Sequence, residues 1–235
     1  MGTERGRKGS VVWVGENEVY VPAAYEESKQ EVLHALIRAH PLGAWVTLVD
    51  GEITVNHIPF VLDADRGPHG TLVGHVARAN PVWKGFSRAV SSVVVFQGAE
   101  SYISPSWYPS KQVHGKVVPT WNYVTVHARG IPIAIDDELW LMRHVEQLTA
   151  IHEATQMLPW RVTDAPADYI GSLLQQIVGI EIPIEALQGK WKISQNRSRT
   201  DRQGVVEGLR AKGGAASNEM AELIARTIES DARQP

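Results

Sequence analysis

Residues 45–62 read WVTLVDGEITVNHIPFVL, and this stretch decides the fold class of the chain. The β-branched and aromatic residues from Trp45 to Val49 follow the two-residue period of a β-strand. Asp50-Gly51 is a dipeptide that tight hairpin turns favour, because both turn residues take positive φ. Ile53–Leu62 then reads as a second strand. Pro59 predicts a bend within it, because proline cannot donate a hydrogen bond to a neighbouring strand.

The rest of the chain continues with strands, and helices are inserted among them and then appended. We expect further strands at 71–76, 92–98, 101–104, 121–130, 131–135, 179–184 and 191–194. The helical period predicts helices after Tyr25 and over 138–156, 165–176, 201–212 and 217–232, with a short helical turn at 80–86. Ser28 and Glu31 have the spacing of a capping box at the first helix. This order lacks the strict β-α alternation of a parallel sheet. A mainly β (α+β) chain with a Greek-key or barrel core and peripheral helices fits better.

Composition places the chain among ordinary globular proteins. Its 235 residues are 43% hydrophobic and 21% charged, and the formal net charge is −3. That balance lacks the strong positive charge of a dedicated nucleic-acid-binding protein. The absence of cysteine excludes disulfides, thiolate nucleophiles and cysteine-ligated metals, and it agrees with a reducing cytoplasm. No apolar stretch reaches the roughly 18 residues that a membrane-spanning helix needs, so we expect a cytoplasmic protein without membrane contact.

Motifs of several enzyme classes are missing from the sequence. We find no phosphate-binding P-loop, no dinucleotide-binding glycine pattern, no G-x-S-x-G elbow and no H-E-x-x-H helix. His144 and His152 fall on roughly the same face of one predicted helix, and we interpret them as packing or surface residues. The sequence therefore predicts no metal site and assigns no catalytic residue.

Two segments place hydrogen-bonding side chains beside the end of a strand. NHIPF, residues 56–60, carries Asn56 and His57 next to the proline bend. GHVARANP, residues 74–81, puts a histidine, an arginine and an asparagine where a strand gives way to a helical turn. Such a turn offers free backbone N–H groups, and Arg78 offers a planar fork of donors, so a phosphate could bind there. A capped turn with a surface arginine is the alternative.

Two further segments are rich in aromatic or basic residues. Residues 96–123, FQGAESYISPSWYPSKQVHGKVVPTWNY, concentrate tyrosines and tryptophans around a long loop, which suits a planar ligand or a subunit interface. An aromatic cluster beneath the loop is the alternative. In residues 190–197, KWKISQNR, two lysines share one face of a predicted strand, and Gln195 and Arg197 follow at its end. A solvated basic strand end is the alternative there.

At these residues the sequence resembles the PaiB-type FMN-binding family, whose members are often described as negative transcriptional regulators. The matching runs are VYVP, NHIPF, GHVARANPVW, FQGAESYISPSWYPSK, GKVVPTWNYVTVHARG, GIEIPIEALQGKWKISQNRS and DRQGVVEGL, which extend from about residue 19 to 210. The resemblance implies an FMN-binding split β-barrel, the fold shared with pyridoxamine-phosphate oxidases and flavin reductases. It also implies a homodimer with FMN in the groove between subunits. We accordingly expect a flexible N-terminal extension at 1–18, a split-barrel domain with inserted helices at 19–198 and a C-terminal helical segment at 199–235.

The resemblance also indicates which segments would meet the cofactor. The strand pair around Thr47 and 56–59 would face the flavin ring, and the turn at 75–80 would hold the ribityl and phosphate groups. The segment 116–122 would come from the same or the partner subunit. The candidate FMN-binding residues are Thr47, Asn56, His57, Ile58, Pro59, His75, Val76, Ala77, Arg78, Asn80, Lys116, Thr120, Trp121, Asn122, Gln195 and Arg197.

Three functions stay open at this point. The first is a redox-active flavoprotein, such as an FMN-dependent oxidoreductase with a nicotinamide donor. The second is a negative regulator that binds DNA or protein. No helix-turn-helix with a basic recognition helix supports direct DNA binding, and acidic residues dilute the basic ones at 197–212. The third is a haem-binding relative of the barrel, with His57, His75, His114 or His127 as candidate iron ligand.

Overall fold

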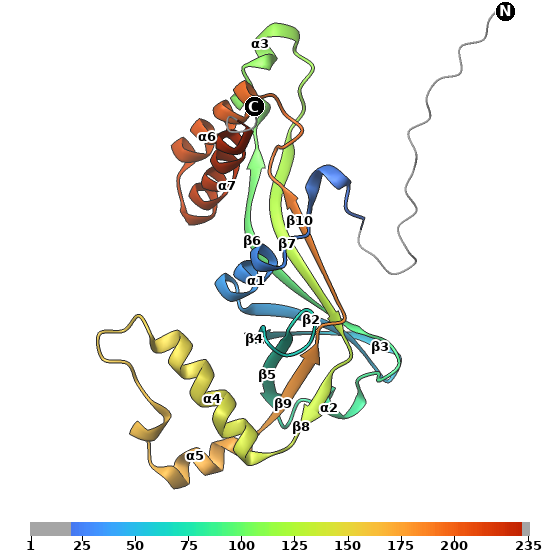
Figure 1. Cartoon of the computed structure of the whole chain (residues 1–235), viewed down its shortest axis with the longest axis vertical. Helices are drawn as coiled ribbons and strands as arrows, with labels where there is room; N and C mark the ends of the chain where they lie inside the picture. The colour runs from blue at the N-terminus through green and yellow to red at the C-terminus, as the bar shows by residue number, and fades with distance from the viewer. Residues whose placement is uncertain (1–19, 232–235) are drawn as a thin grey trace, which may run out of the picture.

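Two antiparallel sheets form the centre of the molecule in the computed structural model, which describes residues 20–231 (Figure 1). The larger sheet has the order β1 (Glu26–Glu27), β10 (Ala186–Lys192), β7 (Thr120–Gly130), β6 (Ser92–Ile103), β2 (Leu42–Val49) and β3 (Glu52–Pro59). The smaller sheet has the order β4 (Val61–Asp63), β5 (Thr71–Ala77), β9 (Ile177–Pro183) and β8 (Ile133–Ile135). These sheets confirm the predicted mainly β, α+β architecture. The predicted extension at 1–18 lies outside the described residues.

The hairpin that decides the fold forms as its sequence predicts. Asp50 and Gly51 take φ values of 50° and 88°, and Val49 pairs with Glu52 across the turn. The second strand breaks at the predicted proline bend. β3 ends at Pro59, and the chain enters the smaller sheet as β4 two residues later. The bend therefore transfers the chain from one sheet to the other.

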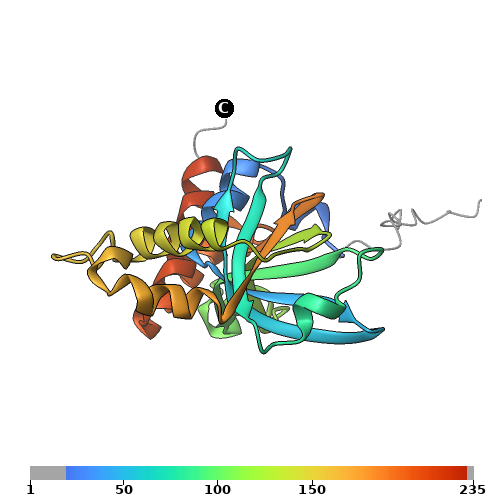
Figure 2. The same cartoon turned by 90° about the horizontal axis from the view of Figure 1, so that it is seen from below.

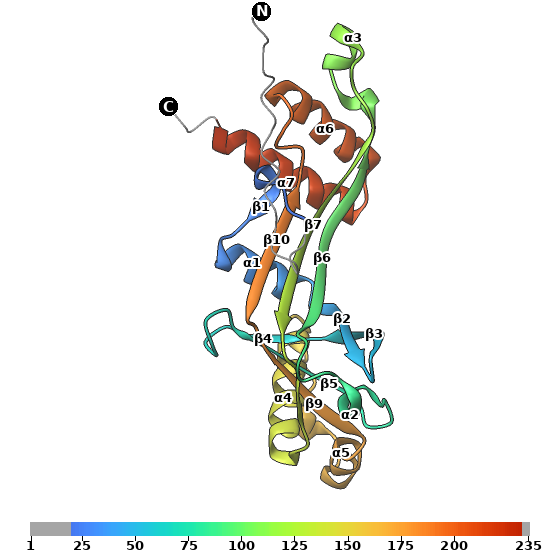
Figure 3. The ribbon, with the colours of Figure 1, turned by 90° about the vertical axis from the view of Figure 1, so that its right-hand side faces the viewer.

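Three long strands carry the larger sheet away from the smaller one. Figure 3 shows β6, β7 and β10 as a ribbon that extends from β5 and β9 towards a distant loop. Strand β6 joins the two predicted strands at 92–98 and 101–104 into one, with a bulge between Gln97 and Glu100. Strand β10 begins at Ala186, earlier than the predicted 191–194. We call the outer end of this ribbon, residues 100–123 and 190–198, the arm.

Helices cover the sheets at both ends of the molecule. They are η1 (Ala23–Tyr25), α1 (Gln30–Ala39), α2 (Val82–Gly85), η2 (Pro105–Trp107), α3 (Ser110–His114), α4 (Glu138–Glu153), η3 (Val162–Asp164), α5 (Ala167–Leu174), α6 (Arg199–Lys212) and α7 (Ala215–Asp231). Figure 2 shows α4 and α5 together on one flank of the strands. Leu209 of α6 and Met220 of α7 are fully buried in the same apolar cluster as the sheets, so this helical hairpin shares the barrel's core.

The predicted capping box at the first helix is wrong. Helix α1 begins at Gln30 with Lys29 at its N-cap position, and no side chain caps it. Ser28 therefore lies one residue before the cap position, where its hydroxyl cannot replace the missing intrahelical partner. The Lys29 backbone N–H is instead bound by the carboxylate of Glu27, at 2.9 Å.

Candidate functional site

A pocket of about 320 Å³ lies where β3 of the larger sheet meets β5 of the smaller one. The NHIPF segment forms one wall, and the GHVARAN segment with the start of β9 forms the other. The lining residues are Asn56, His57, Ile58, Pro59, His75, Val76, Ala77, Asn80 and Ile177. All of these except Ile177 are candidates that the sequence predicted. The structure thus brings two segments that are distant in sequence to one pocket.

Two asparagine side chains leave a hydrogen-bond donor free in the pocket wall. The amide nitrogen of Asn80 donates to Oδ1 of Asn56 at 2.7 Å, and Oδ1 of Asn80 accepts the backbone N–H of Val82 at 3.0 Å. Nδ2 of Asn56 is then buried without a hydrogen-bond partner among the described residues. Because an unpaired buried donor costs free energy, this atom favours a ligand with an acceptor.

A histidine pair supports the opposite wall of the pocket. Nδ1 of His75 on β5 lies 3.0 Å from Nε2 of His144 on α4. Burial lowers the pKa of both imidazoles, and it lowers that of His144 to about 4 with a further contribution from His75. The pair is therefore uncharged at neutral pH. The sequence had suggested that His144 and His152 are similar, but His144 is buried and His152 is exposed.

Arg78 has its hydrogen-bond donors engaged within the chain. Its guanidinium donates to both carboxylate oxygens of Asp136, at 2.9 and 2.6 Å, and to the carbonyls of Gln175 and Ile177. This hydrogen bonding raises the pKa of Arg78 and lowers that of Asp136. Arg78 does not line the pocket. Its contacts favour the capped-turn alternative over a phosphate contact.

Thr47 also lies apart from the pocket. It is buried on β2, and its hydroxyl accepts a hydrogen bond from the hydroxyl of Ser92 at 2.7 Å. The two-residue period of a strand separates its faces but does not say which face the core covers. The structure places Thr47 on the covered face.

The remaining candidates lie in the arm, at the other end of the ribbon from β5 (Figure 1). These are Lys116, Thr120, Trp121, Asn122, Gln195 and Arg197. Lys192 donates to the hydroxyl of Thr120 at 2.7 Å, and the amide of Asn122 donates to the hydroxyl of Ser194 at 2.8 Å. The Arg197 guanidinium lies 4.8 Å from the ring centroid of Tyr108. Within one chain, the predicted residues other than Thr47 and Arg78 therefore form two separate groups.

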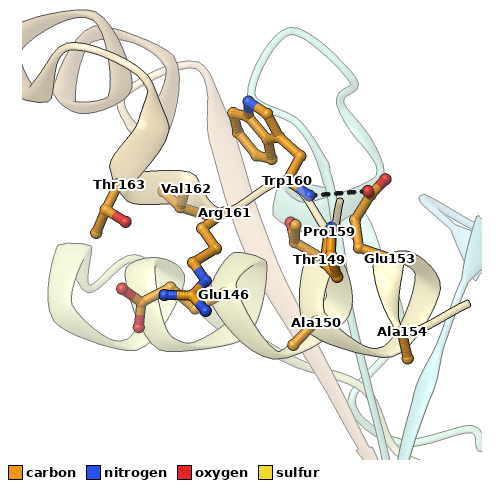
Figure 4. Close-up of a pocket in the computed structure, with 10 residues that line it drawn as sticks. All are labelled: Glu146, Thr149, Ala150, Glu153, Ala154, Pro159, Trp160, Arg161, Val162 and Thr163. Carbon is orange, nitrogen blue, oxygen red and sulfur yellow. Dashed lines mark hydrogen bonds between the residues drawn. The ribbon is translucent and has the colours of Figure 1, made fainter. Parts of the chain in front are cut away.

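A larger cavity of about 420 Å³ lies between α4 and the segment that follows it (Figure 4). Glu153 accepts the backbone N–H of Trp160 at 3.0 Å, which closes the segment onto the helix. Most of its lining residues are apolar or small, and it contains none of the predicted site residues. We therefore do not assign the candidate site to this cavity.

Sequence reasoning missed several residues around the pocket. Trp140 stacks on His144 with ring centroids 5.4 Å apart, and Ile177 completes the lining. The four-residue spacing of Trp140 and His144 places them on one helix face, which was the available signal. Nothing in the sequence says that this face meets β5.

The fold is a split barrel of the type found in flavin-binding proteins. The flavocytochrome Anf3 from Azotobacter vinelandii has a similar structure, with a TM-score of 0.53 at 14% identity over 71% of this chain and 69% of that chain. The FAD and haem binding protein from Mycobacterium smegmatis gives a TM-score of 0.53 at 15% identity over 81% of both chains. At these identities the likeness concerns the fold alone.

The family follows from sequence similarity. The family described as "Putative FMN-binding domain" matches residues 19–186, and the chain belongs to this PaiB-type FMN-binding family. An uncharacterised protein of Emericella nidulans is 35% identical over 88% of this chain and 96% of its own. The protease synthase and sporulation protein PAI 2 of Bacillus subtilis is 31% identical over the same shares. The cofactor of the family is FMN, which confirms the predicted flavin.

No helix in the described part of the chain is long and apolar enough to cross a membrane.

Proposed function

We propose that the chain is a redox-active flavoprotein that binds FMN at the pocket between β3 and β5 and acts as a homodimer. The observation that carries the proposed site is the buried, unpaired Nδ2 of Asn56 in the pocket wall. An isoalloxazine ring has carbonyl and ring-nitrogen acceptors that such a donor can bind. Bound FMN would supply the electron-transfer chemistry, and the protein would supply orientation and polarity.

The residues of the pocket fit part of this cofactor. Its volume of about 320 Å³ lies at the lower end of small-molecule sites. Ile58 and Pro59 offer apolar contact for a ring, while Asn56 and His75 offer polar atoms. No lysine or arginine is among the lining residues, and the nearby Arg78 is bound to Asp136. The phosphate would therefore need positive charge from another part of the assembly.

The arm supports a homodimer that would supply this charge. Lys116, Lys192 and Arg197 give the arm several cations, and the arm is distant from the chain's own pocket. Trp121 and Val118 are 48% and 65% exposed there, which suits a subunit contact. A two-fold dimer makes each contact twice, so a dimer in which one arm covers the partner's pocket would complete both sites.

Direct DNA binding receives little support from the C-terminal hairpin. Arg202 is buried and bonds with Asp231 and Thr227, and Arg210 pairs with Glu222 at 2.7 Å. Lys212 donates to the hydroxyl of Ser101 at 2.9 Å. These contacts hold α6 and α7 together and against β6, and they leave less free positive charge than the sequence suggests.

The experiment begins with the absorption spectrum of the purified protein and the release of FMN on denaturation. Flavin bands and a dimer mass in light scattering support the proposal, whereas a sharp haem band without flavin bands would contradict it. Anaerobic addition of NADH or NADPH should bleach the flavin bands if a nicotinamide nucleotide is the electron donor.

The variant Asn56→Ala tests the position of the site. It removes the donor from the pocket wall, so we expect FMN to bind about 10-fold more weakly, as the loss of one hydrogen bond predicts. Asn218→Ala, an exposed asparagine of α7, is the matched control and should bind like the wild type. Equal FMN affinity in both variants would place the cofactor elsewhere.

A further inference from the structure

A chain of contacts leads from the protein surface to the pocket through His144. Arg66 binds both carboxylate oxygens of Glu181, at 2.8 and 2.7 Å, and this ion pair lowers the pKa of Glu181. Oε1 of Glu181 also accepts the indole N–H of Trp140 at 2.9 Å. The Trp140 ring stacks on His144, which in turn contacts His75. The position of His144 is thus fixed from two sides.

Gly179 makes room for this arrangement. It pairs with His75 across the β5–β9 ladder, and a Cβ at this position would lie 2.2 Å from the Trp140 ring. A side chain here would push Trp140 off β9 and disturb the stack on His144. The close approach of α4 to this sheet therefore depends on a glycine opposite His75.

The contacts of the pair determine which nitrogens carry the protons. Both rings are neutral, so one of the two facing nitrogens donates and the other accepts. Nδ1 of His144 is buried without a partner among the described residues. A buried N–H without an acceptor is rarer than a buried lone pair without a donor, so the proton of His144 belongs on Nε2. His144 then donates to Nδ1 of His75.

This leaves the proton of His75 on its other nitrogen, Nε2. The ring of His75 lines the pocket, and the described part of the chain gives Nε2 no hydrogen-bond partner. Asn56 and His75 lie in the same lining, so the pocket would offer two donors. Among the described residues, the His144 imidazole is the one group whose hydrogen bond fixes this state of His75.

We infer that His144 is a positioning residue that holds His75 as a neutral Nε2–H donor, which hydrogen-bonds an acceptor atom of the flavin. This inference rests on the proposed FMN site and assigns the state of one group in it. His144 itself does not line the pocket and acts through His75. Loss of His144 should free His75 to exchange its proton between the two nitrogens.

The test combines ring-nitrogen NMR with FMN titration at pH 7.5. The signals of His75 are assigned by their loss in His75→Gln, and long-range ¹H–¹⁵N spectra then report its tautomer. We expect Nε2–H in the wild type. In His144→Phe, which keeps an aromatic ring against Trp140, we expect mixed tautomers and FMN binding that is about 10-fold weaker.

Two further variants keep the result interpretable. His144→Gln can place an amide donor near the position of Nε2 and should recover much of the affinity. His152→Phe, an exposed histidine of the same helix, should match the wild type. If His144→Phe does not fold, the wild-type spectrum still reports the tautomer of His75, and His144→Gln still reports the effect of position 144 on FMN affinity.

Two results would overturn the inference: a His75 proton on Nδ1 in the wild type, or an unchanged tautomer and FMN affinity in His144→Phe. The failure of the proposed function has a different signature, because the wild-type protein would then bind no FMN at all. The NMR spectrum would still show in that case whether His144 holds the ring of His75.

Discussion

Arg78 shows that a local motif can suggest a phosphate contact when the side chain in fact binds a residue that is distant in sequence. Its guanidinium is held by Asp136, and its backbone carbonyl accepts the indole N–H of Trp83 at 3.0 Å. We expect Arg78→Ala to weaken FMN binding because the turn beside the pocket loosens. Asp136→Ala breaks the same contact and should weaken binding by the same factor. If Arg78 binds phosphate directly, only Arg78→Ala will reduce the affinity in FMN titrations.

His144 should make stability depend on pH. Its pKa is about 4 in the folded chain and 6.5 in the unfolded chain, so between these values the unfolded chain binds more protons. The contribution of His144 to the free energy of unfolding is complete above pH 6.5 and is lost as the pH falls towards 4. His75 from β5 is the titratable group that faces it, and Glu181 on β9 contacts it only through Trp140.

Urea unfolding at pH 7.5 and pH 5 measures this dependence. The wild type should lose about 2 kcal/mol more between these pH values than His144→Phe, at roughly 1.4 kcal/mol per pH unit. His152→Phe should lose as much as the wild type. The same loss in all three proteins would show that His144 titrates normally in the folded state.

Helix α6 packs on the arm through two glycines that one turn separates. A Cβ at Gly208 would lie 2.3 Å from the ring of Trp107, and one at Gly204 would lie 2.1 Å from the carbonyl oxygen of Trp107. We expect Gly208→Ala to lower the free energy of unfolding by about 1–3 kcal/mol, because the tryptophan must move. At Gly171 on α5, no atom lies within 4 Å of an added methyl group. Gly171→Ala should therefore raise the free energy of unfolding by about 0.5–1 kcal/mol. Similar effects in urea unfolding would refute the packing argument.

The elements themselves were largely readable from local sequence. Asp50-Gly51 and Pro59 act through backbone dihedrals and a missing N–H, so their effects do not depend on distant residues. Ser28 misled because the helix begins at Gln30, which puts Lys29 and not Ser28 at the N-cap position. Strand β1 at Glu26–Glu27 exists only through pairing with β10, which no local pattern encodes.

The candidate site likewise combines residues that the local sequence predicts with contacts that it does not predict. Asn56 and His75 could be predicted because polar side chains beside a proline bend and a strand end have few structural reasons to be there. The partner of Arg78 and the contact of His144 with His75 lie 58 and 69 residues away, and they depend on how α4 packs. Sequence also could not show that the arm candidates lie far from the pocket of their own chain.

A mixed dimer tests whether the arm serves the partner subunit. Asn56→Ala damages the pocket and Arg197→Ala removes a cation of the arm, so each homodimer should bind FMN weakly. If each site combines one pocket with the partner's arm, a heterodimer of the two variants has one site with both defects and one intact site. Random mixing should then restore wild-type affinity at about a quarter of all sites.

The stoichiometry of the tight FMN-binding phase measures this restoration directly. Unfolding and refolding the two variants together gives the mixed dimers, and each variant refolded alone gives the background. If the arm instead serves its own chain, every site keeps one defect and mixing restores nothing. Tight binding that appears only after mixing would join the two separate groups of residues into one composite site between subunits.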